Sequence, residues 1–541
     1  MSDDYPWWKD AVVYHIYLRS FADSDGDGLG DLAGLTAHLD YLRGGPDSLG
    51  VDAVWITPPF PSPDADFGYD VSNYRTIDPR MGTLGDFDRL IAEAHRRGLR
   101  ILLDLVLNHT SAEHPWFVES RRSRQDPRRG WYLWRDPRPG GRPPNNWQSV
   151  FGGPGWTWDE ATGQFYYHMF LPQQPDLNWS NLEVRRELLD VARFWLDRGV
   201  DGFRLDAFNV WGKDPRLPDN PPRLGLRPYD RQSHRFDMDG PLMVSALKDL
   251  RDLLDRYPNR MAVGETIERN SPEKAALHVG DGRLHLAFNF AFGGCPWTPA
   301  AFLHAVQRWE AALGPGHWPS YVLSDHDGAG RHIGRYGGRH AEAIAKVAAA
   351  MLLTLRGTPF IYYGDEIALP PTPIRRSQIL DPVSRHYWPF YSRDPGRAPL
   401  PWDRSPNGGF TAGTPWLPLH DGYASRNVES QQADGDSVFH FYRRLIHLRR
   451  GSDALRRGEF QNLTARPHKG WAYLREAAGE RALVALNFSG RPLGLRLDRP
   501  LPSSRWELTL SSTPRTPARL EGEIVHLAPF EAVVFLSSRN S

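Results

Sequence analysis

The sequence predicts an α/β protein: a (β/α)8 TIM barrel with an inserted domain after strand 3 and a C-terminal antiparallel β-sandwich. Three observations support this fold class. Eight short strand-like runs recur along the chain, with helical periodicity between them. After Leu448 the pattern changes to short strand-like runs with polar turns. The chain, with 541 residues, is long enough for a barrel with insertions and one smaller domain.

The strand-like runs define the expected barrel. The eight predicted strands are Ala11–Leu18, Val51–Thr57, Leu99–Leu107, Val200–Leu205, Met261–Val263, His285–Asn289, Tyr321–Leu323 and Phe360–Tyr363. The third run is mostly apolar, as expected for a strand that is buried on both faces. Asp31–Leu42 and Phe87–Arg97 have helical periodicity after the first two runs. This alternation predicts a closed parallel barrel.

Two long segments interrupt the alternation. Residues 111–178 are rich in Pro, Gly, Trp and Arg and predict a small domain inserted on a βα loop. Residues 368–434 follow the eighth run, lack regular periodicity and are typical of a functional lid. The predicted domains are therefore the barrel (1–110 and 179–452), the inserted domain (111–178) and the sandwich (453–541). The strand-like runs of the last segment include Ala472–Leu474, Leu483–Asn487 and Ile524–Leu527.

The composition of the chain narrows the range of possible functions. Lys+Arg and Asp+Glu both number 65, so no basic excess predicts a nucleic-acid or membrane partner. The 20 Trp, 20 Tyr and 25 Phe residues are compatible with a carbohydrate site, because sugar CH faces stack on aromatic rings, although most of these rings should form core. Cys295 is the single cysteine, and Met1–Asp10 lacks the features of a signal peptide. We therefore expect a soluble cytoplasmic protein that is a monomer or a weak homo-oligomer.

Acidic residues occur where four of the predicted strands end. A single Asp after a strand is commonly a helix N-cap, but active sites of (β/α)8 barrels lie at the C-terminal ends of the strands. Four strands deliver carboxylates to one rim, which favours a site over four independent caps. The strand-end residues are Asp104, Asn108 and His109 after the third strand, Arg204 and Asp206 in the fourth, Glu265 after the fifth, and Asp325, His326 and Asp327 after the seventh.

These residue types suit glycoside hydrolysis, which needs a carboxylate at the anomeric carbon and an acid at the leaving oxygen. Asp206 is the predicted nucleophile, because Arg204 lies two residues earlier on the same strand face and favours its ionised form. Glu265 is the predicted acid/base, with a raised pKa. Asp327 is the third acid and holds the sugar hydroxyls. A retaining mechanism requires Asp206 and Glu265 to flank the anomeric centre about 5–5.5 Å apart.

Over nearly its whole length the chain resembles the α-amylase superfamily, glycoside hydrolase family 13, in its α-glucosidase and oligo-1,6-glucosidase branch. The strand-end motifs carry the resemblance, together with Gly68-Tyr69-Asp70 and the run from Gln174 to Trp179. It implies a retaining, exo-acting α-glucosidase that acts on small oligosaccharides. The substrate-binding residues implied by the resemblance are Asp66, Tyr69, His109, Phe151, Phe170, Gln174, Arg204, His326 and Arg397.

Three positions bear on substrate specificity. Ala207 follows the nucleophile, and within this branch that residue favours α-1,4 over α-1,6 linkages. Asp325 and Phe67 stand where relatives commonly have Asn, which puts substrate preference in question. One alternative is a transglycosylating or trehalose-synthase-type enzyme, in which a sugar intercepts the same intermediate. A more remote one is a non-catalytic sugar-binding homologue, which is disfavoured because the three catalytic carboxylates are retained.

An acidic run in the first βα loop predicts a metal site. Oxygen-bearing residues alternate with small ones, which suits a hard cation held by carboxylates and one backbone oxygen. The twelfth position of the run is Gly34 rather than Glu, so the run is not an EF-hand. The predicted ligands are Asp23, Asp25, Asp27, Leu29 and Asp31. The family resemblance also implies a structural Ca2+ here, with Mg2+ left open, and no organic cofactor is expected.

Overall fold

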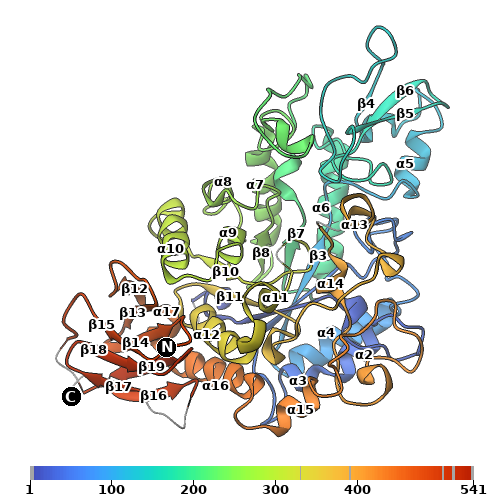
Figure 1. The fold of residues 1–541 in the computed structure, drawn as a ribbon. Coiled ribbons are helices and arrows are strands. Elements are labelled where there is room, and N and C mark those ends of the chain that lie inside the picture. The colour runs from blue at the N-terminus through green and yellow to red at the C-terminus, as the bar shows by residue number, and fades with distance from the viewer. Residues whose placement is uncertain (1–4, 329, 389–390, 503–504, 514–517, 538–541) are drawn as a thin grey trace.

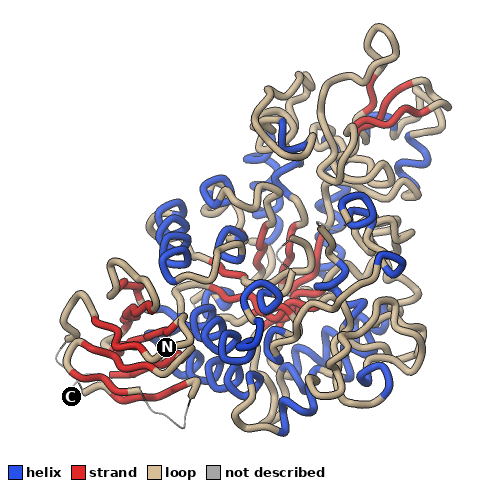
Figure 2. The backbone as a smooth tube through the Cα atoms, in the orientation of Figure 1, coloured by secondary structure: helices blue, strands red, loops and turns tan. Residues whose placement is uncertain are grey.

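The computed structural model describes residues 5–328, 330–388, 391–502, 505–513 and 518–537. Eight parallel strands form one sheet at the centre of the molecule, in the order β10-β11-β1-β2-β3-β7-β8-β9 (Figures 1 and 2). The Ser320 hydroxyl on one edge strand donates to the Ala287 carbonyl on the other at 2.7 Å, which joins the two edges. The predicted (β/α)8 fold is thereby confirmed. The strands are β1 Val13–Ile16, β2 Ala53–Ile56, β3 Arg100–Leu105, β7 Gly202–Leu205, β8 Met261–Gly264, β9 Leu286–Ala287, β10 Ser320–Val322 and β11 Thr358–Tyr362.

Helices follow the strands and surround the sheet (Figure 2). The predicted helix Asp31–Leu42 is interrupted at His38, whose φ of −103° and ψ of 12° are not helical. The predicted helix Phe87–Arg97 begins earlier, at Leu84, because Thr83 and Asp86 form a capping box. The barrel helices are α2 Leu32–Ala37, α3 Leu39–Leu42, α4 Leu84–Arg96, α6 Leu182–Asp197, α7 Leu242–Leu254, α8 Pro272–Ala276, α9 Phe290–Gly293, α10 Pro299–Leu313, α11 His332–Tyr336, α12 Ala341–Thr354 and α16 Val438–Gly451; α1 Trp7–Asp10 precedes them.

The barrel interior is filled by apolar side chains from successive strands. Alternate residues of a strand point inward, so each strand contributes one or two side chains to a packed layer. The layer closes the middle of the barrel, and the polar strand-end residues therefore face the open C-terminal end. Its members include Val13, Ala53, Trp55, Leu102, Met261, Val263, Leu286, Val322 and Phe360.

The segment after β3 forms a small antiparallel sheet, in the order β4-β6-β5, that extends from the C-terminal end of the barrel (Figure 1). Its last residues are tied to the barrel by Lys213, whose ammonium lies 2.7 Å from Asp176 and donates to Asn108 at 3.1 Å. This buried contact fixes the inserted segment relative to the end of β3. The elements of the segment are α5 Pro115–Ser120, β4 Trp134–Arg135, β5 Trp156–Asp159 and β6 Gln164–Tyr167.

The long segment after β11 is largely irregular, as predicted from its lack of periodicity. Its α-helices are short, and one of them, α14, carries two arginines beside the strand ends: Arg393 at its N-cap and Arg397 at its last residue. The helices are α13 Pro382–Tyr387, α14 Asp394–Arg397 and α15 Val428–Ala433.

The C-terminal strands form two antiparallel sheets, of five strands and three strands, at the opposite end of the molecule from the inserted sheet (Figure 1). Helix α17 (Asp453–Arg457) precedes the first of these strands, which begins at Glu459. Arg475 is buried and donates to the carbonyls of Gly458 and of Thr354, at the end of α12. The strands are β12 Glu459–Asn462, β13 Gly470–Ala477, β14 Glu480–Asn487, β15 Leu493–Arg496, β16 Glu507–Ser511, β17 Arg519–Glu521, β18 Ile524–Leu527 and β19 Ala532–Ser537.

All helices formed by the described residues are too short or too polar to cross a lipid bilayer.

Candidate active site

A cavity of about 140 Å³ lies at the C-terminal ends of the barrel strands, between the inserted segment and the segment after β11. Its wall contains nine of the predicted site residues, which come from separate parts of the chain. Those nine are Asp66, Tyr69, His109, Phe151, Phe170, Gln174, Asp206, Glu265 and Asp327. The wall also contains residues that the sequence did not single out: Val150, Thr266, Ile267, Arg269, Gly328, Tyr391 and Arg393.

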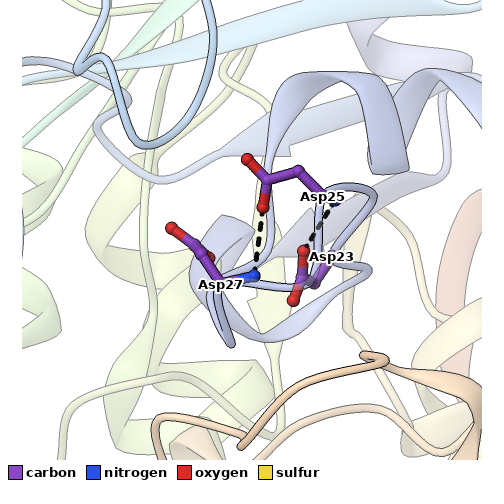
Figure 3. A group of neighbouring side chains, drawn as sticks. All are labelled: Asp23, Asp25 and Asp27. Atoms are coloured by element: carbon purple, nitrogen blue, oxygen red, sulfur yellow. Dashed lines mark hydrogen bonds between the residues drawn. The ribbon is translucent and has the colours of Figure 1, made fainter.

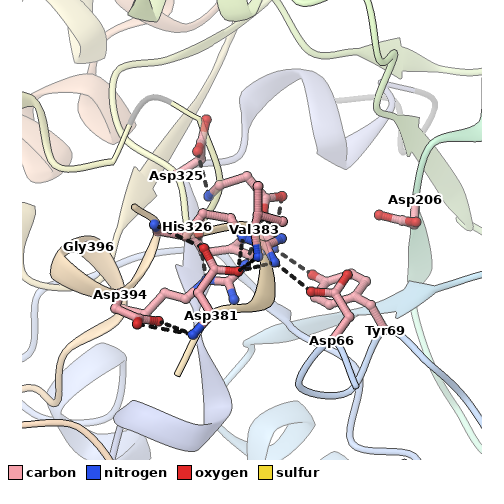
Figure 4. Close-up of polar contacts among 12 residues, drawn as sticks. Asp66, Tyr69, Asp206, Asp325, His326, Asp381, Val383, Asp394 and Gly396 are labelled. Carbon is pink, nitrogen blue, oxygen red and sulfur yellow. Dashed lines mark hydrogen bonds and ion pairs between the residues drawn. The ribbon is translucent and has the colours of Figure 1, made fainter. Parts of the chain in front are cut away.

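Asp206 reaches this cavity because the chain turns sharply after β7. Ala207, the next residue, has a φ of 41° and a ψ of 37°, in the left-handed region that a residue with a Cβ seldom adopts. Figure 4 shows Asp206 pointing toward the group formed by Asp66, Tyr69 and His326. The turn thus directs the carboxylate toward the space where the other polar groups converge.

One buried guanidinium, that of Arg204, links three carboxylates. It donates to Asp206 at 2.9 Å and to both oxygens of Asp104 at 2.8 and 2.9 Å, and its second terminal nitrogen contacts Glu265. Burial raises the pKa of Asp206, and the charge of Arg204 opposes that rise without cancelling it. Burial also raises the pKa of Asp104 to about 7. Arg204 therefore favours the ionised form of Asp206, the predicted nucleophile, but burial outweighs its effect.

Asp327 lies beside two arginines and a histidine. Its carboxylate is 2.9 Å from Arg397 and 3.2 Å from both Arg393 and His326. Burial alone would raise the pKa of Asp327, but His326 and the two guanidinium groups hold it well below its usual range. Arg397 differs from expectation, because it is fully buried behind Asp327 and donates to the His326 carbonyl at 2.8 Å. Arg393, and not Arg397, lines the cavity.

An ion pair connects the loop after β2 with the segment after β11 in the cavity wall. Arg393 lies 2.6 Å from Asp66, in the loop after β2, and 2.6 Å from Asp381 (labelled in Figure 4). Gln174 donates a further hydrogen bond to Asp66 at 3.3 Å. Tyr69 donates to Asp104 at 2.9 Å and lies 2.8 Å from His326. These contacts fix the polar groups at this end of the cavity.

An aromatic wall comes from the inserted segment. The Phe170 ring lies 5.0 Å from the His109 ring and 5.3 Å from the Phe151 ring. The Arg393 guanidinium covers Phe151, 5.1 Å from the ring centre. Apolar rings beside fixed hydrogen-bonding groups are the usual composition of a site for a small polar ligand with CH faces.

Sequence reasoning missed the partners that reach the strand-end carboxylates from loops. Arg269 lies 2.9 Å from Glu265 and also pairs with Asp325, whose carboxylate accepts the Asp327 N–H at 2.8 Å. The negative charge of Asp325 is thus compensated by Arg269. The spacing of four residues between Glu265 and Arg269 was the only local signal, and Arg393 had none because its segment is aperiodic.

The acidic run in the first βα loop brings three of its predicted ligands together. Oxygens of Asp23, Asp25 and Asp27 lie within 4.8 Å of one another (Figure 3). Burial and the neighbouring carboxylates raise the pKa of Asp27, as expected for like charges in one place. Asp31 has another role here: it accepts the Ser24 N–H at 2.7 Å and the Gly34 N–H at 2.6 Å and caps α2. The donor set of the first three residues, with the Leu29 carbonyl two residues on, fits a hard cation such as Ca2+.

Comparison with known proteins gives consistent matches over most of the chain. Residues 15–458 match the family model described as alpha amylase, catalytic domain. A probable alpha-glucosidase of Rhizobium meliloti is 43% identical, with 90% of each chain covered. An oligo-1,6-glucosidase of Parageobacillus thermoglucosidasius is 39% identical, with 98% of each chain covered. The crystal structure of the alpha-glucosyl transfer enzyme XgtA is 41% identical, with a TM-score of 0.91 and coverage of 99% of this chain and 100% of that one.

Proposed function

Because this chain belongs to the α-amylase superfamily, glycoside hydrolase family 13, in its α-glucosidase and oligo-1,6-glucosidase branch, we propose that it is a retaining, exo-acting α-glucosidase that prefers α-1,4 linkages. Membership of this branch makes the chain a glycoside hydrolase. The observation that supports the finer proposal is the cavity in which Asp206 and Glu265 share one guanidinium. Two carboxylates held side by side are what a double displacement requires.

In the first step, Asp206 attacks the anomeric carbon of the terminal glucose while Glu265 protonates the glycosidic oxygen. The bond to that oxygen breaks, and the remaining sugar leaves with the proton. In the second step, Glu265 takes a proton from water, and the water oxygen replaces Asp206 at the anomeric carbon. Asp327, held ionised by its arginines, is suited to bind sugar hydroxyls and to stabilise the positive charge of the transition state.

Exo attack is supported by the ion pair between Arg393 and Asp66. Both groups line the cavity and are joined at 2.6 Å, so we place the terminal glucose against them with no room for a further sugar. Gln174 and His109, from the inserted segment and the end of β3, complete the polar end. An endo-acting enzyme needs a groove that is open at both ends, and this pair would block one of them.

Linkage preference is tied to Ala207, which lines the cavity directly after the nucleophile. Its small side chain leaves space beside the bond to be cleaved, and valine would fill that space. Rates on maltose and isomaltose test the proposal: kcat/KM should favour maltose in the wild type. Ala207→Val should shift the ratio toward isomaltose by about tenfold, the scale of one or two methyl groups in a pocket. A wild type that prefers isomaltose would contradict the α-1,4 assignment.

Glucosyl transfer is a second candidate, supported by the similarity to a solved alpha-glucosyl transfer enzyme. The cavity wall also includes Ile267 and Val150, whose apolar surfaces suit a sugar acceptor better than water. In transfer, a sugar hydroxyl replaces water in the second step. Product analysis on maltose distinguishes the two: hydrolysis yields glucose alone, and transfer yields longer or rearranged glucosides.

We also propose that the first βα loop holds a structural Ca2+ through Asp23, Asp25 and Asp27, with the Leu29 carbonyl as a fourth ligand. The ion would neutralise three neighbouring carboxylates and stiffen the loop. The chemistry at the anomeric carbon does not involve it.

A further inference from the structure

Arg269 is held in a fixed position beside the acid/base candidate. It belongs to the loop after β8, and its guanidinium packs on the Phe290 ring, 3.5 Å from the ring centre. One terminal nitrogen donates to Glu265 at 2.9 Å, and the other pairs with Asp325, which comes from the loop after β10 and is labelled in Figure 4. Asp325 is buried, while Arg269 retains about a quarter of its side-chain exposure. The cation is therefore anchored on one side and presented to Glu265 on the other.

We propose that Arg269 is a positioning residue for Glu265, and that Asp325 tunes how strongly Arg269 acts. This inference rests on the proposed function, in which Glu265 gives and takes the proton. Arg269 sets the direction in which Glu265 faces the glycosidic oxygen and the ease with which it releases its proton. Asp325 anchors the same guanidinium through its other terminal nitrogen and offsets part of its positive charge.

The other charged groups around Glu265 are already committed to partners. Arg204 contacts Glu265 but also binds Asp104 and Asp206, and it is fully buried. Arg269 pairs with both Glu265 and Asp325, and the Asp325 carboxylate also accepts the Asp327 N–H. The titratable and charged groups that share the cavity wall with Glu265 are Asp66, Tyr69, His109, Asp206, Arg269, Asp327, Tyr391 and Arg393.

The direction in which each substitution moves the titration of Glu265 follows from the charge that is removed. Loss of the cation in Arg269→Gln removes an interaction that favours ionised Glu265, so Glu265 should keep its proton to higher pH. Loss of the nearby anion in Asp325→Asn leaves the positive charge of Arg269 without that offset, so Glu265 should lose its proton at lower pH. Since the protonated form is required in the first step, the alkaline limb of kcat/KM should move up in the first variant and down in the second.

The experiment is a set of pH profiles of kcat/KM on maltose for the wild type, Arg269→Gln, Asp325→Asn and the double variant. We expect limb shifts of about one pH unit in opposite directions, the size of one nearby charge, and a double variant that behaves like Arg269→Gln. Arg269→Lys, which keeps the charge but loses the fork, should leave the limb in place and lower the rate. Limbs that coincide in all variants would overturn the proposal.

Leaving-group dependence separates positioning from general damage. p-Nitrophenol leaves without a proton, whereas the glucose released from maltose needs one. Arg269→Gln should therefore reduce kcat/KM on maltose about tenfold or more and leave kcat/KM on p-nitrophenyl α-glucoside nearly unaffected, because kcat/KM does not include the second step, in which Glu265 acts as base with both substrates. Equal losses on both substrates would indicate a merely structural role and would contradict the proposal.

The result that would refute the proposed function differs from the result that would refute the role of Arg269. A wild type that cleaves neither substrate would refute the glucosidase assignment and not the contact. The contact itself is then tested by difference infrared titration of carboxyl groups, with Glu265→Gln used to assign the signal. Arg269→Gln should move the Glu265 titration to higher pH, and an unmoved titration would overturn the inference.

Discussion

Two groups of three acidic residues occur near the C-terminal end of the barrel, and the chain treats them in opposite ways. In the cavity, Asp206, Glu265 and Asp327 each lie 2.9 Å from a different arginine: Arg204, Arg269 and Arg397 respectively. In the first βα loop, Asp23, Asp25 and Asp27 accept hydrogen bonds from backbone N–H groups and the Thr411 hydroxyl, and no cationic side chain among the described residues pairs with them.

The difference indicates where each group obtains its positive charge. Fixed arginines hold a carboxylate in one place and in one protonation state without occupying the space where a substrate binds. Clustered carboxylates without such partners repel one another and are relieved when a cation binds from solution. The first arrangement suits chemistry on a sugar, and the second suits a reversible structural ion.

The strongest test of the cavity group is Asp206→Asn. The substitution keeps the shape but removes the nucleophile, so kcat should fall by about 10⁴-fold or more, as on removal of an essential catalytic group. Far-ultraviolet circular dichroism should show an unchanged fold. Asp190→Asn, the same change in a half-exposed pair with Arg193 on α6, is the matched control and should keep full activity. Undiminished turnover in Asp206→Asn would refute its assignment.

Loss of one cavity arginine should have a smaller effect. Arg393→Gln leaves Asp66 and Asp381 without their cation, so kcat/KM on maltose should fall about 10²-fold, mainly through binding of the terminal glucose. Thermal stability should also fall, because a buried charge is left unpaired. Arg193→Gln, at the surface of α6, is the control. If steady-state kinetics give an unchanged KM, Arg393 does not contact the substrate.

Acidity should affect the cavity through Asp206 and not through Asp327. Burial raises the pKa of Asp206 above the ordinary value of 3.8, so its ionised form is lost at a higher pH than in an exposed aspartate. The pKa of Asp327 is lowered, and this residue stays ionised throughout that range. The acid limb of the kcat/KM profile should therefore lie above pH 3.8. A limb at or below that value would mean that burial does not control the nucleophile.

Metal removal tests the loop group and should have the smallest effect. Chelation with EDTA should lower the melting temperature by about 1–2 °C, the shift expected in a chain of this size from losing one or two kcal/mol of binding free energy. Activity on maltose should change little at temperatures below melting. Asp25→Asn removes one ligand and should abolish the response to EDTA. A metal content and melting temperature that EDTA leaves unchanged would show that the loop does not hold an ion.

The sequence was sufficient to predict the barrel and the residues at its strand ends. Strand periodicity fixes which residues end each strand, and the fold fixes that those ends meet, so Asp206, Glu265 and Asp327 were predictable. Arg269 and Arg393 were not, because their loops have no periodicity and their positions depend on tertiary contacts. For the same reason, Arg397 was predicted to contact the substrate, whereas the structure has Arg393 in the cavity wall.

Two further differences between prediction and structure lie in the segment that begins at Asp31. Asp31 was predicted as a metal ligand from spacing alone, yet the start of α2 needs an acceptor for its free N–H groups, and Asp31 provides it. The helix predicted from Asp31 to Leu42 is divided at His38. The apolar periodicity continues through this residue, but its backbone leaves the helical conformation.

Arg475 connects the C-terminal sandwich to the barrel and contributes to the stability of the barrel. Its guanidinium donates to the Thr354 carbonyl at the end of α12, and α12 leads directly into β11, the strand beside β1. A shortened chain that stops before β12 would leave the Thr354 carbonyl without the Arg475 donor and would expose the apolar face that the sandwich covers. Expression of the barrel alone is therefore expected to yield aggregates and not a smaller working enzyme.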